Sequence, residues 1–236
     1  AIYKDGEKIE ELVKEDANAY VVTPNVDHIV RLEYDREFRA AYKNANLILA
    51  DGMPLIWISK IYGTPIKQKI SGADLLPKLC ERAAKKNYTM FFLGAPEGVG
   101  ERARQVLEHQ YQGLKVVGTY SPPYMFEKNA EEVRKIVKML REIKPDILIL
   151  GLSGPRQENF IYRYRNIMGV PVSLGLGASL DFAAGSSKRA PKWMQDHGLE
   201  WLYRMIHDKR LVRRYLVNDT TIVFLFFKYL FRTKKA

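Results

Sequence analysis

Short apolar runs alternate with longer helical patterns along most of the chain, and this alternation constrains the fold more than any other feature. The runs are AYVV, LILA, TMFFL, LKVVGT, DILILGL and VPVSLGL. Strands separated by helices pair in parallel through crossover connections. A nearly continuous apolar strand such as ILILGL also needs cover on both faces. The sequence therefore predicts an α/β fold: a Rossmann-like, doubly wound, mainly parallel sheet, with one helix covering residues 26–45.

The basic character of the chain is concentrated near its C-terminus. The net charge is +11, and residues 186–236 hold twelve Lys or Arg against four Asp or Glu. A locally basic segment can bind nucleic acid, anionic lipid or a phosphorylated substrate, and charge alone does not choose among them. We therefore expect two parts, a catalytic domain over residues 1–195 and a basic helical C-terminal appendage over residues 196–236.

The appendage has the pattern of an amphipathic helix. Helical spacing groups four of its apolar residues on one side, with charged residues opposite. The apolar residues are Trp201, Met205, Val212 and Leu216. Such a helix, followed by IVFLFFKYLF and RTKKA, suits an anionic membrane interface, and the alternative is a helix docked on the body with its charges in water. The apolar stretch is too short to cross a bilayer, which takes roughly 20 residues, and the charged N-terminal residues do not resemble a signal peptide.

Polar residues and glycines follow five of the predicted strands. Ligands of parallel α/β sheets bind beyond the carboxyl ends of the strands. The residues at these positions are Thr23, Asn25, Asp51, Gly94, Gln157, Glu158, Gly175 and Gly177. Each of them could instead form a turn or cap a helix. Their convergence on one edge of the sheet favours a ligand cleft.

The glycines of residues 94–100, GAPEGVG, suggest which ligand the cleft binds. Glycines that expose backbone amides at a helix start favour phosphate groups. Their spacing is not that of a dinucleotide-binding motif, and the chain has no Walker sequence, which disfavours NAD-dependent oxidoreductases and ATPases. A nucleotide-sugar remains, and the test of the oxidoreductase alternative is whether NAD raises the melting temperature.

Asp51 is the candidate catalytic base. It follows an apolar strand and precedes a glycine, which places a carboxylate at the mouth of the cleft, where it can accept a proton. In an inverting sugar transfer, such a carboxylate takes the proton of the acceptor hydroxyl as that oxygen attacks the anomeric carbon. The alternative is that Asp51 caps the following helix.

We expect neither a metal nor another cofactor. The chain has no D-x-D pair, and its four histidines, His28, His109, His197 and His207, lack paired ligand spacing. Something else must then neutralise the departing diphosphate, and guanidinium groups and helix N-terminal amides can do so. The candidates are Arg204, Arg210, Arg213 and Arg214.

Five motifs occur in one order, and together they carry a family resemblance. They are TPNVDHIV at residues 23–30, LADGMPL at 49–55, FLGA at 92–95, GLSGPRQE at 151–158, and the segment 175–204 that begins GLGASLDF. In these motifs the chain resembles the WecG/TagA/CpsF family of bacterial glycosyltransferases, most of all its N-acetylmannosaminyltransferase members.

The resemblance implies an inverting enzyme at the cytoplasmic face of the bacterial membrane, in wall teichoic acid synthesis. It would transfer N-acetylmannosamine from UDP-N-acetylmannosamine to the 4-hydroxyl of N-acetylglucosamine on undecaprenyl diphosphate. It implies Asp51 as the base, Thr23 and Asn25 in the sugar pocket, and Gln157 and Glu158 beside the nucleotide or acceptor. It also implies self-association that changes on lipid contact.

Other interpretations remain open at this stage. Lys69 stands where many relatives have arginine, and a lysine lacks the bidentate fork for phosphate. A related transferase would move a mannosaminuronate or glucosyl unit instead. A nucleic-acid-binding protein would use the basic tail, but the chain has no recognisable nucleic-acid module. Cys80, the one cysteine, suits the packed face of a helix and excludes an internal disulfide.

Overall fold

The computed structural model describes residues 2–15, 18–197, 199–207, 221 and 225. In this part of the chain, six parallel strands form one sheet in the order β2-β1-β6-β5-β3-β4. They are β1 (Ala19–Val22), β2 (Leu47–Ile48), β3 (Thr89–Gly94), β4 (Lys115–Tyr120), β5 (Ile147–Gly151) and β6 (Val172–Gly175). Each of the six apolar runs contributes one strand, which confirms the predicted α/β fold.

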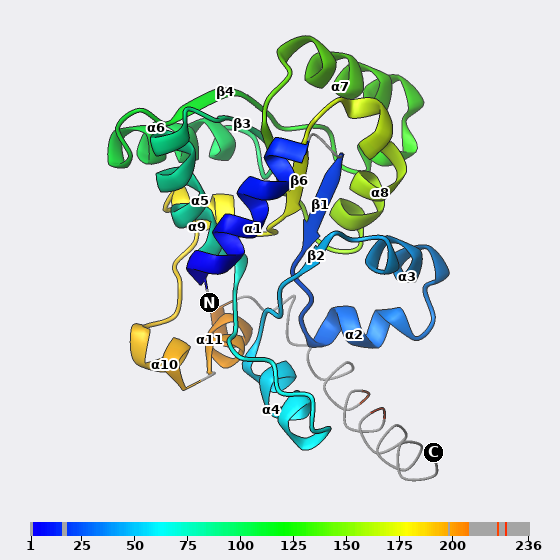
Figure 1. The fold of residues 1–236 in the computed structure, drawn as a ribbon, viewed down its shortest axis with the longest axis vertical. Helices are drawn as coiled ribbons and strands as arrows, with labels where there is room; N and C mark the ends of the chain where they lie inside the picture. Colours follow the sequence, from blue (N-terminus) through cyan, green and yellow to red (C-terminus); the bar gives the residue numbers. More distant parts are fainter. Residues whose placement is uncertain (1, 16–17, 198, 208–220, 222–224, 226–236) are drawn as a thin grey trace.

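Helices cover both faces of the sheet (Figure 1). One face packs against α1 (Ile2–Glu15), α5 (Gly72–Lys86), α6 (Val99–Gln110) and α9 (Ser179–Ala183). The other packs against α3 (Arg36–Lys43), α7 (Ala130–Ile143) and α8 (Arg156–Met168). The remaining elements are α2 (Val26–Leu32), α4 (Met53–Ile61), the short 3-10 helix η1 (Phe126–Lys128), α10 (Lys192–Asp196) and α11 (Glu200–His207).

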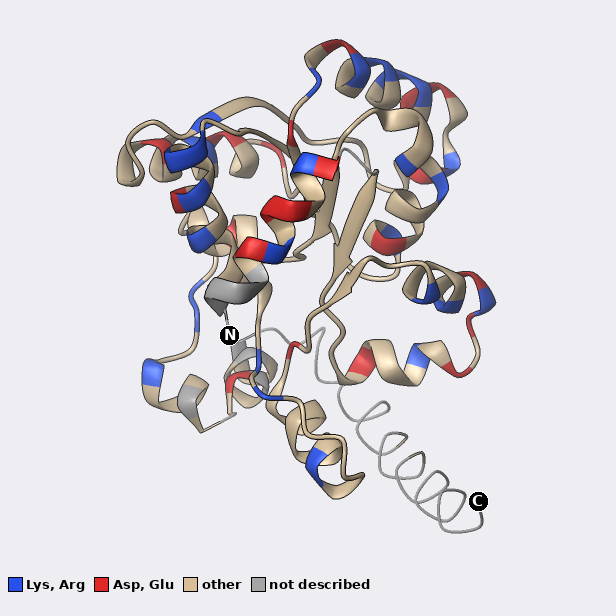
Figure 2. Cartoon of the chain, in the orientation of Figure 1, with Lys and Arg blue, Asp and Glu red and all other residues tan. Residues whose placement is uncertain are grey.

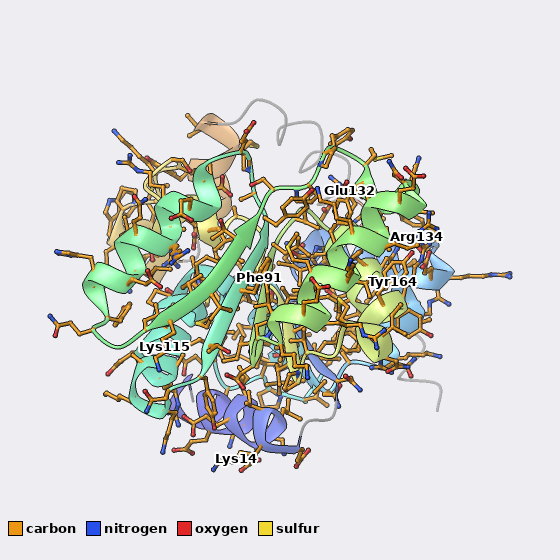
Figure 3. All side chains as sticks on the ribbon, turned by 90° about the horizontal axis from the view of Figure 1, so that it is seen from above. Lys14, Phe91, Lys115, Glu132, Arg134 and Tyr164 are labelled. Atoms are coloured by element: carbon orange, nitrogen blue, oxygen red, sulfur yellow. The ribbon has the colours of Figure 1, made fainter. Side chains whose placement is uncertain are left out.

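Successive side chains of the central strands point to alternate faces of the sheet and so form two cores. On β3, Met90 and Phe92 enter the core under α5 and α6, whereas Phe91 and Leu93 enter the core under α7 and α8. Figure 3 views the molecule from above and shows β3, with Phe91, between the two helical layers. Successive side chains of a strand point to opposite faces, so an unbroken apolar run is what a sheet covered on both sides requires. Cys80 is buried in the first of these cores, as predicted.

The predicted helix over residues 26–45 is wrong in one respect, because two helices occupy this segment. α2 ends at Leu32, and Asp35 then caps α3 by accepting a hydrogen bond from the backbone N–H of Phe38 at 3.0 Å. A capping aspartate competes with helix continuation. The break lets Phe38 and Tyr42 of α3 pack edge-on against His28 of α2.

The connections between strands diverge to the two faces at the carboxyl edge of the sheet. The chain leaves β1 and β5 toward α3 and α8 on one face, and leaves β3 and β6 toward α6 and α9 on the other. Neighbouring strands whose chains diverge in this way form a topological switch point, where ligands bind. Among the described residues, no helix is long and apolar enough to cross a membrane.

Candidate active site

Asp51 lies half-buried just beyond β2, at the carboxyl edge of the sheet. Its backbone N–H donates to the carbonyl of Pro24, which follows β1, at 2.8 Å. The carbonyl of Ala50 accepts from the N–H of Ile70 at 2.8 Å. These two bonds hold the base of the loop that carries Asp51. The N-cap position of α4 belongs to Gly52, with a φ of 131°, so Asp51 is not at the capping position that the alternative interpretation required.

Thr23 and Gly175 join the neighbouring strands β1 and β6 at the same edge. The Thr23 hydroxyl is buried and donates to the carbonyl of Gly175 at 3.1 Å. Asn25, two residues farther along, caps α2 by accepting from the backbone N–H of His28 at 3.2 Å. The polar residues after β1 therefore have structural roles here, and their contact with a sugar remains a prediction.

Gln157 connects the start of α8 to the loop after β6. Its side-chain oxygen accepts from the N–H of Gly177 at 3.0 Å, and its side-chain nitrogen donates to Glu158 Oε1 at 2.8 Å. Gly175 makes room for this amide, because a Cβ there would lie 2.9 Å from Gln157 Cδ. Gly177 has a φ of 54°, in the left-handed region that favours glycine. The predicted residues Gln157, Glu158 and Gly177 are thus joined by hydrogen bonds and Gly175 packs against the Gln157 amide, and the contact of all four with substrate remains a prediction.

A buried polar cluster, which we call the His28 cluster, lies behind this edge and comprises His28, Tyr42 and Glu158. Glu158 is fully buried in the first turn of α8, and His28 Nδ1 lies 2.7 Å from the Tyr42 hydroxyl. His28 and Glu158 both pack against the Cα of Gly154. A Cβ there would lie 2.5 Å from His28 Nε2 and 3.3 Å from Glu158 Oε2.

The negative charges of Asp51 and Glu158 both act electrostatically on Tyr42. Burial raises the pKa of the Tyr42 phenol far above its ordinary value, and the negative charges of Glu158 and Asp51 raise that pKa further. Asp51 therefore shares the electrostatic environment of the His28 cluster. Sequence reasoning missed His28 and Tyr42 as site residues, because only the break between α2 and α3 brings them together. The one usable signal was a histidine in the first turn of the helix after β1.

Glycine is required at position 94 because the ends of β3 and β5 approach each other closely there. Its φ is 98°, and a Cβ would lie 2.8 Å from Leu152 and 2.9 Å from the carbonyl of Gly151 on β5. Gly98 has a φ of 77° and is the N-cap of α6. The backbone thus accounts for both glycines, and phosphate binding by the amides of this loop remains a prediction.

Two cations, Arg189 and Lys69, are engaged in ion pairs with carboxylates. Arg189 binds Asp74 at 2.7 Å and Glu200 at 3.2 Å, and Lys69 binds Glu200 at 3.4 Å. These contacts, which we call the Arg189 network, join α11 to the start of α5. Lys69 is thus paired with a carboxylate, and its exclusion as a phosphate ligand remains a prediction. Arg204 lies on α11 with its side chain outside the described part, and Arg210, Arg213 and Arg214 are also outside the described residues.

In the part of the chain that the structure describes, neither a metal cluster nor the groove between α7 and α8 marks the site. Within the described ranges, no group of three or more His, Cys, Asp or Glu side chains could hold a metal ion. A groove of about 420 Å³ lies between α7 and α8, lined by residues that include Arg134 and Tyr164, both labelled in Figure 3. It lies on the outer helical layer and is separate from the residues at the carboxyl edge.

Comparison with protein families gives one match, which covers almost the whole chain. The model of the glycosyl transferase WecG/TagA/CpsF family matches residues 5–236. This range includes the edge residues described above, from Thr23 to Gly177.

Curated relatives from three bacteria have the same name, N-acetylglucosaminyldiphosphoundecaprenol N-acetyl-beta-D-mannosaminyltransferase. The Bacillus spizizenii protein is 30% identical over 86% of this chain and 76% of its own length. The Bacillus subtilis protein is 30% identical over 82% of this chain and 73% of its own length. The Staphylococcus aureus protein is 27% identical over 84% of this chain and 75% of its own length.

Proposed function

This chain belongs to the WecG/TagA/CpsF family of glycosyltransferases, and from that premise we propose that it is an N-acetylmannosaminyltransferase. The donor would be UDP-N-acetylmannosamine. The acceptor would be the 4-hydroxyl of N-acetylglucosamine carried on undecaprenyl diphosphate. The shared name of the three relatives supports the transferred sugar, its β linkage and the lipid-linked acceptor.

The mechanism that we propose depends on the position of Asp51. Its carboxylate takes the proton of the acceptor hydroxyl while that oxygen forms a bond to the anomeric carbon of the donor. The bond from that carbon to the diphosphate oxygen breaks, and UDP leaves with the electron pair. The half-buried position of Asp51 just beyond β2 supports this role, because ligands of parallel α/β sheets bind at this edge and a carboxylate there can accept the proton of a bound hydroxyl.

The other edge residues and the tail would bind the substrates. In this proposal, Thr23 and Asn25 border the sugar, and the loop of residues 94–100 faces the diphosphate. Arg204, Arg210, Arg213 and Arg214 would offset the charge of the departing UDP. The basic tail would hold the enzyme at the anionic, cytoplasmic face of the membrane, and no metal would be needed.

Product analysis tests the proposal. The enzyme is supplied with synthetic lipid-linked N-acetylglucosamine and an equimolar mixture of the UDP derivatives of N-acetylmannosamine, N-acetylmannosaminuronate and glucose. UDP release is measured with and without a chelator, and the lipid product is identified by mass. We expect an N-acetylmannosamine disaccharide at the same rate in both conditions. A uronate or glucosyl product would reassign the donor, and loss of activity with chelator would reject metal independence.

A further inference from the structure

The segment of residues 52–70 forms a hairpin that leaves the body beside Asp51 and returns to the same place. It begins after Asp51, runs through α4, and closes where the N–H of Ile70 donates to the carbonyl of Ala50. Ser59 holds the returning segment of the hairpin, because its hydroxyl accepts from the N–H of Ile66 at 2.9 Å. Figure 1 shows α4 extending from the carboxyl end of the sheet. We call this segment the α4 hairpin.

The inner face of α4 is anchored to the body. Leu55 and Ile56 are buried with Ala50, and Val26 and Ile29 of α2 pack against them. These contacts explain the apolar residues on one side of α4. They leave the apolar residues on its other side without a role in the core.

The outer face of α4 exposes large apolar side chains next to a lysine. Trp57 is 47% exposed and Ile61 is 59% exposed, and Lys60 is exposed between them. Residues three and four positions apart share one face of a helix, so these three side chains form a single surface. Ile66, on the returning segment of the hairpin, is also exposed.

All charged residues of the α4 hairpin are lysines. Residues 52–73 contain Lys60, Lys67 and Lys69 and no Asp or Glu. Figure 2 shows α4 and the segment after it with blue and no red. Through Lys69, the base of the hairpin also meets Glu200 of α11, and α11 carries another exposed apolar residue, Ile206.

We propose that the outer face of the α4 hairpin inserts into the interface of an anionic membrane and presents Asp51 to the lipid-linked acceptor. Trp and Ile beside Lys are the side chains that bind the boundary between headgroups and acyl chains. The exposed Lys60 and Lys67 add attraction to anionic headgroups, which acts within a Debye length of the surface. The proposal rests on the proposed function, because a lipid-linked acceptor delivers its sugar at the membrane surface. The α4 hairpin brings such a surface to the carboxylate that would deprotonate the acceptor.

Depth-dependent quenching tests the insertion directly. Trp193→Phe and Trp201→Phe together leave Trp57 as the single tryptophan of the full-length chain. Vesicles of phosphatidylglycerol with brominated acyl chains should quench its fluorescence, and unbrominated vesicles should shift its emission to shorter wavelength. Emission that responds to neither kind of vesicle would overturn the proposal.

Paired substitutions give a second test with a matched control. Trp57→Ser with Ile61→Ser should weaken partitioning onto phosphatidylglycerol vesicles about tenfold, because both apolar contacts are lost. Ile167→Ser, at an exposed site on α8, should leave partitioning unchanged. Unchanged partitioning of the Trp57 and Ile61 variant would reject insertion, as would a change confined to its oligomeric state in sedimentation velocity.

Transfer to a water-soluble, short-chain acceptor separates this proposal from the proposed function. The Trp57 and Ile61 variant should keep wild-type transfer to that acceptor and lose transfer to the acceptor embedded in vesicles. Equal transfer to both acceptors would overturn the role of the α4 hairpin. No transfer by the wild-type enzyme to either acceptor would overturn the proposed function, while the quenching test would still decide membrane insertion.

Discussion

His28 Nδ1 lies 2.7 Å from the Tyr42 hydroxyl, and this contact determines which nitrogen of the ring faces the active site. The Tyr42 phenol stays protonated, since its pKa is raised far above the ordinary value, first by burial and then by the charges of Glu158 and Asp51. Among the described residues, His28 Nδ1 is the hydrogen-bond partner of that hydroxyl. A buried O–H donates where an acceptor is available. In the tautomer whose Nδ1 accepts from this hydroxyl, a neutral ring has its proton on Nε2, the nitrogen that packs against Gly154.

Tyr42→Phe should lower kcat and should lower the free energy of unfolding only slightly. The substitution removes the donor that selects the His28 tautomer, and the ring can then turn its unprotonated nitrogen toward Gly154. We expect about tenfold lower kcat and about 1 kcal/mol lower free energy of unfolding, the cost of one neutral hydrogen bond. Tyr20→Phe is the control, because the Tyr20 hydroxyl donates to the backbone carbonyl of Ala41 in the same core. Equal kcat in the two variants would show that Tyr42 is structural only.

Asp51→Asn should abolish most of the turnover and keep donor binding. The amide has nearly the shape of the carboxylate but cannot accept the hydroxyl proton, so kcat should fall about a thousandfold. UDP should still raise the melting temperature by the wild-type amount, because the variant leaves the diphosphate contacts unchanged. The two measurements are initial rates and thermal unfolding with and without UDP. A variant with near-normal turnover would remove Asp51 from the mechanism.

The parts of the fold that follow from periodicity could be predicted from the sequence. The six apolar runs gave the six strands, and the doubly covered sheet followed from their continuity. The break at Asp35 could not be predicted from periodicity, because Asp35 lies in an otherwise regular helical pattern and only the packing of Phe38 and Tyr42 favours the bend.

The edge of the sheet could be predicted, but most of the contacts at that edge could not. Thr23 and Asp51 follow strands and Gly175 ends β6, so parallel topology alone places them together. The pairing of Gln157 with Gly177, and of Arg189 with Asp74, depends on how loops of unrelated sequence meet in space. The same is true of the His28 cluster, whose members come from three separate helices.

Gly175→Ala should destabilise the protein and disturb the active site. The new Cβ would lie 2.9 Å from Gln157 Cδ, and displacing that amide would break its bond to the N–H of Gly177. We expect about 2 kcal/mol lower free energy of unfolding in urea and a lower kcat. Gly100→Ala is the control for stability. The nearest atom to its Cβ would be 3.5 Å away, and alanine in a helix should stabilise by about 0.5 kcal/mol. Equal stability of the two variants would show that the Gln157 amide moves without cost.

Asp74→Asn should lower stability at neutral pH but not in acid. Burial disfavours the charge of Asp74, but hydrogen bonds from Arg189 and Ser71 outweigh it and hold the pKa of the carboxyl below its ordinary value. A lowered folded-state pKa means that this contribution is complete above the ordinary pKa of about 4 and is lost as the pH falls through the folded value. We expect Asp74→Asn to cost about 2 kcal/mol at pH 7, measured by urea unfolding. The difference from wild type should shrink steadily below about pH 4.

Glu142→Gln, which breaks the exposed pair with Lys138, is the control, and it should change stability by less than about 0.5 kcal/mol at either pH. A cost of Asp74→Asn that is the same in acid and at neutral pH would mean that the charge of Asp74 does not stabilise the Arg189 network.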